Sequence, residues 1–226
     1  NRNASVEELN LEKIHKLLEE AGAGLGGGVS SSQGEMNSGI QLYDGITTDE
    51  IQEILIRSAS DLISLETPNY QFVAARLLLY GLKKQVFADV WANGHPPVLE
   101  HVKRCVERGV YDAGIIDKYN ASEWETIESF VDHERDYLFT YAGIRQVADK
   151  YLVQDRSSGE VYETPQFMYI MIATTLFQDY PKDTRLDYVR RYYEATSRHK
   201  INIPTPIMAG VRTPLRQFAS CVLVDC

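Results

Sequence analysis

Apolar residues recur at helical spacing through the first ninety residues, with polar residues between them. The spacing predicts three amphipathic helices, at residues 9–21, 48–62 and 70–90. Asn10 and Thr48 stand at the expected N-cap positions of the first two helices, where a short polar side chain accepts hydrogen bonds from free N–H groups. Three helices with one apolar face each predict a small bundle.

Glycine and proline divide the chain around this bundle. Residues 22–34 are rich in Gly and Ser and are expected to form a surface loop. A phosphate-binding loop is the alternative, but the segment lacks the Lys-Ser/Thr ending of that motif. Asn93-Gly94 followed by Pro96-Pro97 predicts a boundary after the third helix.

Helical spacing resumes beyond this boundary. Helices are expected at residues 98–108, 122–132, 141–148, 164–177 and 184–197, with a β-hairpin at residues 150–163. The apolar and β-branched residues after Pro206 predict one buried strand. Packing between helices is favoured over base stacking for the aromatic residues Phe167, Tyr169, Phe177, Tyr188, Tyr192 and Tyr193.

Composition is that of an ordinary globular chain. The 226 residues are 44% hydrophobic and 24% charged, and a chain of this size buries roughly 70% of its unfolded surface. The formal charge of −9 disfavours a nucleic-acid surface, which needs a basic stripe. No apolar run approaches the roughly 20 residues that cross a bilayer, and the first segment lacks a signal-peptide core. We therefore expect a cytoplasmic protein that binds neither nucleic acid nor membrane.

Thiol and metal chemistry have few candidates in the residues alone. Three cysteines argue for reduced thiols over a disulfide framework. Cys105 shares a helix with Val102 and Val106, which favours an ordinary thiol. Cys226 falls on the opposite strand face from Cys221, so a disulfide between them is not expected.

No metal site is expected in this chain. His133-Glu134 lacks the second histidine of HExxH, and His101 with Cys105 forms one isolated pair. The charged run that contains Arg135 favours a structural ion-pair cluster of Asp132, Glu134, Arg135 and Asp136.

Helix ends offer a phosphate site in the first ninety residues. Cations beside a helix N-terminus suit phosphate because free N–H groups and the helix dipole attract anions. Solvated surface charge is the alternative interpretation. The residues concerned flank the first helix (Arg2, Glu7, Asn10 and Lys13), begin the second (Thr48) and end the third (Lys84).

Several ordered motifs resemble the large (alpha) subunit of class I ribonucleotide reductase. The longest is PTPIM, GVRTP, RQF and SCV across residues 204–222. The others are LNLEKIH at 9–15, YDGITT at 43–48, PNYQFVAARL at 68–77, HERD at 133–136 and KYLVQD at 150–155. Because that subunit is several times longer, we expect this chain to be its N-terminal portion, cut from a longer chain or made separately by a divided gene.

The resemblance implies a mainly α (α+β) fold in three parts. Residues 1–92 are expected to form an ATP-cone, a helical bundle with a small β-cap. Residues 93–200 are expected to form a helical domain, and residues 201–226 the first strand of a ten-stranded α/β barrel. The family reduces ribonucleoside diphosphates to deoxyribonucleoside diphosphates by thiol-dependent radical chemistry. A non-catalytic nucleotide-sensing or assembly module is the alternative, and a purely helical scaffold would have no use for the C-terminal motifs.

The resemblance also assigns an effector site for ATP or dATP. Arg2, Lys13 and Lys84 match phosphate-binding positions, Glu7 and Asn10 the surroundings of the base, and Thr48 the phosphate or sugar region. The chain departs from the family at Asn1, Gln52 and Gly81, which replace a lysine and two histidines, and in an apparently missing β-cap strand. Since those histidines affect inhibition by dATP in the family, inhibition is expected to differ here.

For catalysis, the resemblance makes Cys221 one of two redox cysteines, with Thr205 and Ser220 near the substrate diphosphate. The partner cysteine and the radical-forming cysteine lie beyond this chain in the family. The partners it implies are the remainder of the large subunit, a small subunit with the radical metal cofactor, and thioredoxin or glutaredoxin.

Overall fold

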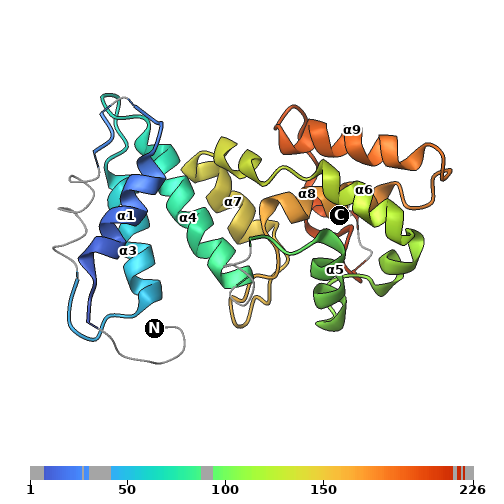
Figure 1. Ribbon diagram of the computed structural model, residues 1–226, viewed down its shortest axis with the longest axis horizontal. Coiled ribbons are helices and arrows are strands. Elements are labelled where there is room, and N and C mark those ends of the chain that lie inside the picture. Colours follow the sequence, from blue (N-terminus) through green and yellow to red (C-terminus); the bar gives the residue numbers. More distant parts are fainter. Residues whose placement is uncertain are drawn as a thin grey trace, which may run out of the picture. The chain divides into compact units, whose positions relative to one another are not determined.

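The computed structural model describes residues 8–26, 28–30, 42–87, 94–215, 218, 219 and 221. Within these residues the regular structure is helical (Figure 1). The α-helices are α1 (Leu11–Gly22), α3 (Thr48–Asp61), α4 (Tyr70–Val86), α5 (Val98–Glu107), α6 (Ala121–Phe130), α7 (Tyr141–Lys150), α8 (Pro165–Leu176), α9 (Arg185–Ser197) and α10 (Thr205–Gly210). Two 3₁₀ helices, η2 (Ala113–Lys118) and η3 (His133–Leu138), lie between them.

The chain divides into two compact units. The first comprises Asn1–Leu82 and Tyr137–Gln146, and the second comprises Lys83–Asp136 and Val147–Cys226.

The first unit is a helical bundle whose helices begin at capping side chains. Asn10 is the N-cap of α1, as predicted, and its Oδ1 accepts a hydrogen bond from the Lys13 N–H at 3.2 Å. Thr47, and not Thr48, is the N-cap of α3. The Thr47 hydroxyl accepts from the Glu50 N–H, and the Glu50 carboxylate accepts from the Thr47 N–H. A Glu three residues after Thr47 completes this reciprocal capping box, so the N-cap lies one residue before the predicted one.

Side chains of α4 tie the loop after α1 to the bundle. Arg76 Nη1 donates to the carbonyls of Ala21 and Ala23, at 3.1 and 2.8 Å. Asn69 Nδ2 donates to the Leu25 carbonyl at 2.7 Å. These donors satisfy carbonyls that a helix C-terminus leaves without intrahelical partners. The described part of the Gly/Ser-rich segment is thus loop, and residues 27 and 31–34 lie outside the described residues.

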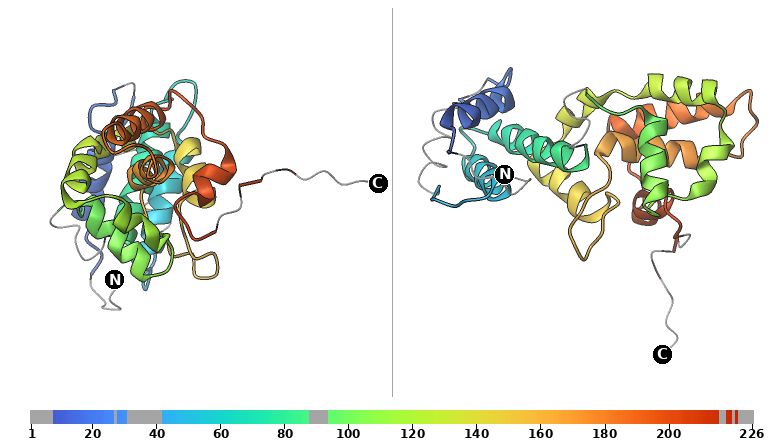
Figure 2. Two further views of the ribbon diagram at one scale, coloured as in Figure 1. Left: turned by 90° about the vertical axis from the view of Figure 1, so that its right-hand side faces the viewer. Right: turned by 60° about the horizontal axis from the view of Figure 1, so that its bottom comes forward.

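The second unit is built around α8. Every residue from Pro165 to Thr174 is buried, as expected of a helix that is apolar on all sides. Helices α9 and α10 pack on it, while α6 packs on α9 and α5. Figure 2 shows α8 within this group. The predicted helices of this region are confirmed within one or two residues at each end.

The predicted hairpin is reduced to a single antiparallel bridge. Gln154 pairs with Val161, and the flanking hydrogen bonds run from Asp155 N–H to the Glu160 carbonyl at 2.8 Å and from Tyr162 N–H to the Val153 carbonyl at 2.9 Å. Residues 150–163 are called the bridge loop below.

The strand predicted after Pro206 is not found in the described residues. Residues 205–210 form α10, with Pro204 as N-cap and Pro206 in its first turn. Proline suits this position because the first helical N–H groups have no partner and its fixed φ is already helical. No strand of a β-cap or barrel occurs in the described part of the chain, although residues 1–7, 31–41 and 222–226 lie outside it.

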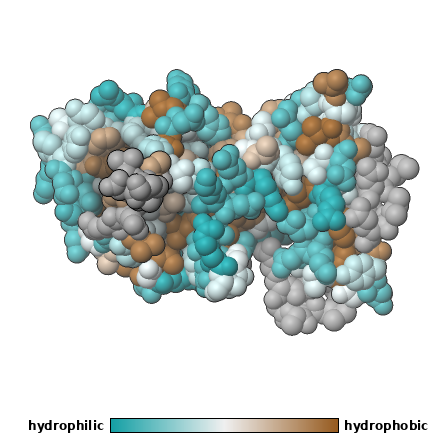
Figure 3. Space-filling model, turned by 180° about the vertical axis from the view of Figure 1, so that it is seen from behind, coloured by the Kyte–Doolittle hydropathy of each residue, from teal (hydrophilic) through white to brown (hydrophobic). Residues whose placement is uncertain are grey.

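Hydrophilic residues cover most of the face in Figure 3, with apolar residues in small groups among them. Among the described residues, no helix has the length and apolar character needed to span a membrane.

Candidate functional site

Three of the residues predicted to bind an effector lie in the described first unit. Asn10 and Lys13 are exposed at the start of α1, and Thr48 is the first residue of α3 and half-buried. Figure 1 shows α1 and α3 beginning at the same end of this unit. Two helix N-termini and a lysine therefore face solvent at one end, which is favourable for an anion.

The other predicted effector residues do not belong to the described part of the first unit. Arg2 and Glu7 lie outside the described residues. Lys84 lies in the last turn of α4 and belongs to the second unit.

Two of the expected departures from the family pattern, Gln52 and Gly81, lie beside each other in the first unit. Gln52 Nε2 donates to the Leu77 carbonyl at 2.7 Å. A Cβ at Gly81 would lie 3.1 Å from Gln52 Cγ, so the absent side chain of Gly81 makes room for the glutamine. Gln52 and Gly81 thus form one packed arrangement at the two positions where the resemblance leads us to expect histidines.

In the second unit, the predicted substrate residue Thr205 begins α10. Its Oγ1 lies 3.3 Å from the Tyr151 hydroxyl, and both groups are exposed enough to meet a ligand. Ser220 lies outside the described residues.

Arg212 anchors the segment that contains α10 from within. Its guanidinium forms a bidentate ion pair with Glu163, and both side chains are fully buried. Arg212 also donates to the Met208 carbonyl at 2.5 Å and to the Tyr151 carbonyl at 3.1 Å. Arg212 therefore joins α10 directly to the backbone of the residue whose hydroxyl contacts Thr205.

The Glu163 carboxylate has further donors. The Tyr111 hydroxyl donates to one oxygen, and the Val153 N–H donates to the other at 2.7 Å. Burial, then the Glu163 charge, raises the pKa of Tyr111 well above its usual value, so the phenol remains a donor. Burial opposes the charge of Arg212, but Glu163 outweighs it and raises the pKa of the guanidinium. We call Tyr111, Glu163 and Arg212 the buried anchor.

The two described cysteines have opposite surroundings. Cys221 is exposed, whereas Cys105 is buried. Burial raises the pKa of the Cys105 thiol to about 12, which makes thiolate chemistry there unfavourable. Cys105 Sγ lies 3.5 Å from His101 Nε2, and burial lowers the pKa of His101 to about 3. The described residues contain no group of three or more His, Cys, Asp or Glu side chains arranged for a metal ion.

The charged run around Arg135 forms ion pairs, but not as one cluster. Arg135 contacts Asp132 at 3.2 Å and Glu194 at 2.6 Å. Asp136 instead lies 3.6 Å from the buried Lys83 ammonium and accepts a hydrogen bond from Gln166 at 2.9 Å. Burial raises the pKa of Asp136 to about 6, although Lys83 opposes that shift.

Sequence reasoning missed Tyr151 and the buried anchor. Tyr151 stands in the KYLVQD motif and Arg212 in GVRTP, so the motifs contained the signal. Their contacts join positions about 50 to 60 residues apart, and a single sequence does not pair such positions.

Comparison with known families gives two matches. The ATP cone domain matches residues 1–85, and the family described as "Ribonucleotide reductase, all-alpha domain" matches residues 137–216.

The chain is also similar to curated large subunits of one enzyme. It is 49% identical over 228 residues to ribonucleoside-diphosphate reductase subunit alpha of Haemophilus influenzae and 49% over 226 residues to ribonucleoside-diphosphate reductase 1 subunit alpha of Escherichia coli. It is 45% identical over 216 residues to the subunit alpha of Enterobacteria phage T4. These alignments cover 100%, 100% and 95% of this chain but only 29%, 29% and 28% of the relatives.

Proposed function

Since the chain belongs to the ribonucleotide reductase large-subunit family and corresponds to its N-terminal region, we propose that it serves in the reduction of ribonucleoside diphosphates to deoxyribonucleoside diphosphates. The observation that carries the proposal is near-50% identity along the entire chain, both units included. The proposed domains are an ATP-cone at residues 1–92, a helical domain at 93–200 and the start of the catalytic barrel at 201–226.

In this proposal Cys221 is one of the two thiols that supply the reducing electrons. Two thiols give up two electrons and two protons as one S–S bond forms, while the 2′-hydroxyl leaves as water and hydrogen replaces it. An external dithiol then reopens the disulfide by exchange. Cys105 is less suited to this role, because it is buried and burial raises the pKa of its thiol to about 12.

Thr205 and Ser220 are proposed to lie beside the substrate diphosphate. A hydroxyl suits this role because it can donate a hydrogen bond to a phosphate oxygen, and Thr205 is exposed. Contact between Thr205 and the Tyr151 hydroxyl gives the diphosphate a second donor at the same place.

The first unit is proposed to bind ATP or dATP as an effector. Lys13, with the N-termini of α1 and α3, fits a phosphate chain. Asn10 is proposed near the base, and Thr48 near the phosphate or sugar. Arg2, Glu7 and Lys84 complete the proposed set.

The proposed partners are the rest of the large subunit, a small subunit that holds the radical metal cofactor, and thioredoxin or glutaredoxin. The proposed location is cytoplasmic. Within the large-subunit family the remaining catalytic cysteines lie beyond this region, so we expect the 226-residue chain to be inactive alone.

Reconstitution tests the catalytic role. The chain, the remainder of the large subunit and the small subunit are combined with ribonucleoside diphosphate and dithiol. We expect multiple turnovers that Cys221→Ser abolishes and Cys105→Ala leaves close to normal. Turnover by the chain alone, or full activity of Cys221→Ser, would contradict the assignment. A complex without turnover that still binds ATP would favour the nucleotide-sensing module.

Calorimetry with ATP and dATP tests the effector site. Lys13→Ala is expected to weaken binding by roughly 1–3 kcal/mol through loss of a charge-assisted hydrogen bond. Lys16→Ala is the matched control, since this lysine is on the same helix and 77% exposed. Equal affinity of the Lys13 variant and the parent would place the site elsewhere.

A further inference from the structure

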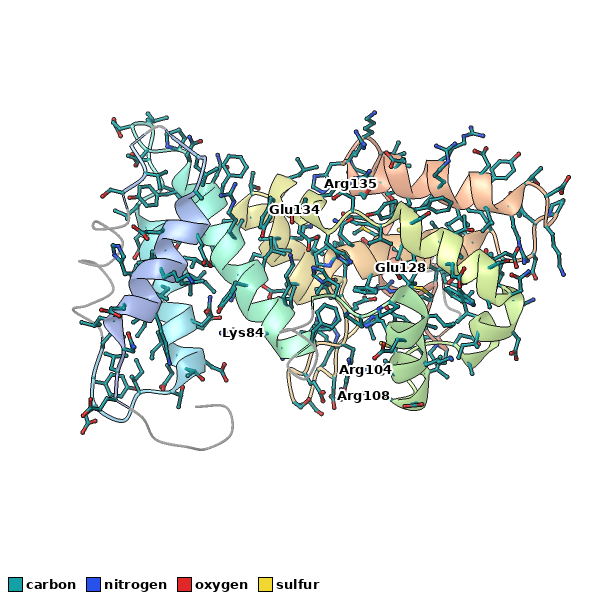
Figure 4. The ribbon with its side chains drawn as sticks, in the orientation of Figure 1. Lys84, Arg104, Arg108, Glu128, Glu134 and Arg135 are labelled. Atoms are coloured by element: carbon teal, nitrogen blue, oxygen red, sulfur yellow. The ribbon has the colours of Figure 1, made fainter. Side chains whose placement is uncertain are left out.

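A cavity of about 170 Å³ lies in the second unit, between α5, the end of α4 and the bridge loop. It has no part in the function proposed above. Arg104 in the last turn of α5 and Arg108 at its C-cap both line it. Figure 4 labels both side chains near the C-terminal end of α5.

Arg108 is held in place by the bridge loop. Its Nη1 lies 2.5 Å from Glu160 Oε1, and its guanidinium carbon lies 5.3 Å from the centre of the Tyr162 ring. The Tyr162 hydroxyl donates to the other Glu160 oxygen at 3.1 Å. Arg108 is therefore oriented at the cavity wall before any ligand arrives.

Unlike Arg108, Arg104 has no hydrogen-bond acceptor for its side chain among the described residues. It is half-buried and lines the same cavity. A guanidinium has five N–H donors in a planar fork that fits carboxylate and phosphate oxygens. Such a group, partly withdrawn from water, gains most from an oxyanion that enters the cavity.

The cavity floor adds no negative charge. Burial lowers the pKa of His101 to about 3 and raises that of Cys105 to about 12, so both are neutral at pH 7. Among the lining side chains, the two arginines outweigh the single carboxylate of Glu160. The Gln85 side-chain amide, which donates to the Gly159 carbonyl at 3.2 Å, is a further polar group of the wall.

We propose that this cavity binds a small oxyanion of the phosphate class, with Arg104 as its principal ligand and Arg108 as the second cation. The volume sets the class, because pockets for drug-sized molecules are roughly 300–1,000 Å³. A free phosphate ion, or one phosphoryl group of a larger molecule, fits where a whole nucleotide does not.

Titration of the 226-residue chain with inorganic phosphate, followed by ³¹P NMR line broadening, tests the proposal. Saturable binding is expected, and Arg104→Gln should weaken it about tenfold or more because a charge-assisted bond is lost. Lys103→Gln is the matched control, as an exposed neighbour on the same helix, and should bind as the parent does. Arg104→Lys, which keeps the charge without the fork, should fall between them.

Comparison of ligands separates the possible sources of the anion. Phosphate that competes with ATP and depends on Lys13 would occupy the effector site and overturn the proposal. Phosphate binding that survives in Lys13→Ala and is lost in Arg104→Gln supports it. Tighter binding of a phosphomonoester than of phosphate, with the same dependence on Arg104, would identify a phosphoryl group as the ligand. Absence of saturable binding, or equal binding by Arg104→Gln, would refute it.

Discussion

A buried arginine is tolerable only where acceptors surround it, and Arg212 meets that condition. Its guanidinium donates to both oxygens of Glu163 and to the carbonyls of Met208 and Tyr151. Taking two charges out of water costs several kcal/mol for each ion. The contacts offset that cost while both partners are present, and the cost becomes visible when one partner is removed.

We therefore expect Arg212→Met to lower the free energy of unfolding by about 3–5 kcal/mol, because Glu163 is left buried without its counter-ion. The double variant Arg212→Met with Glu163→Leu should recover part of that loss. Urea unfolding measures both. Lys118→Gln removes an exposed pair with Asp179 and should change stability by about 1 kcal/mol or less. A similar small change for Arg212→Met would show that the anchor is not a structural requirement.

A substitution at Gly81 tests whether the absence of a side chain there makes room for Gln52. Alanine is favoured over glycine inside a helix by about 1 kcal/mol, but a Cβ here would lie 3.1 Å from Gln52 Cγ. We expect Gly81→Ala to stabilise the Gln52→Ala variant by about 1 kcal/mol and the parent by less. A double-mutant cycle from thermal or urea unfolding gives the coupling. Equal gains in both backgrounds would mean that the two positions are independent.

At the scale of elements, the capping box predicts different losses of stability for substitutions at the neighbouring residues Thr47 and Thr48. Thr47→Ala should cost about 1 kcal/mol, because the hydroxyl that accepts from Glu50 N–H is lost. Thr48→Ala should change stability by at most about 0.5 kcal/mol, since its hydroxyl makes no hydrogen bond in the described residues. Unfolding measurements decide this, and ATP affinity of Thr48→Ala can then be interpreted without a folding defect. A larger loss for Thr48→Ala would reassign the cap.

Helix positions followed from the sequence because burial on one face imposes a period of 3.6 residues. The stripe of Ile14, Leu18 and Ala21 on α1 is an example. Residues 205–210, just after the point where composition favours a strand, form α10 instead, while residues 216, 217, 220 and 222–226 lie outside the described residues. Whether proline begins a helix or interrupts one depends on where the preceding turn ends, and residues 204–206 resolve this as a helix start.

The candidate site also contains some residues that the sequence identifies and others that only the folded structure brings together. Asn10 was identifiable as a cap because its partner lies three residues away. Thr205 was named from a motif, but its neighbour Tyr151 is 54 residues distant in sequence. The buried anchor joins α10 to residues before α8, and only the folded chain brings these together.

At the scale of the molecule, the second unit encloses several imidazoles in an aromatic interior. His95 and His133 stack with ring centres 3.6 Å apart, and His101 lies 4.1 Å from the Phe167 ring centre. Burial, then the charge of Lys83, lowers the pKa of His95 to about 4. Burial, followed by His95, Lys83 and His101, lowers the pKa of His133 to about 3.

The three histidine shifts make the folded state less stable as pH falls. Each histidine stays neutral in the folded chain but gains a proton in the unfolded chain below pH about 6.5. Its contribution is therefore complete above that pH and is lost as pH falls toward its folded pKa. Asp136 acts oppositely, because its raised pKa favours the folded state as pH falls from about 6 to 4. Three lowered histidine pKa values outweigh one raised carboxyl, so unfolding should become easier between pH 7 and pH 5.

The variant His133→Phe measures how much one histidine contributes to the pH dependence of stability. The replacement keeps an aromatic ring against His95 and Phe167 and removes a buried Nδ1 that has no hydrogen-bond partner. Near pH 5 the free energy of unfolding of the variant should vary with pH less steeply than that of the parent, by about 1.4 kcal/mol per pH unit for one proton. Urea unfolding at pH 5, 6 and 7, followed by Trp fluorescence since Trp124 is buried in this unit, measures the slope. His15→Gln, at a half-exposed histidine of the first unit, should leave it unchanged. The same slope in His133→Phe and the parent would mean that His133 is protonated in the folded chain at pH 5.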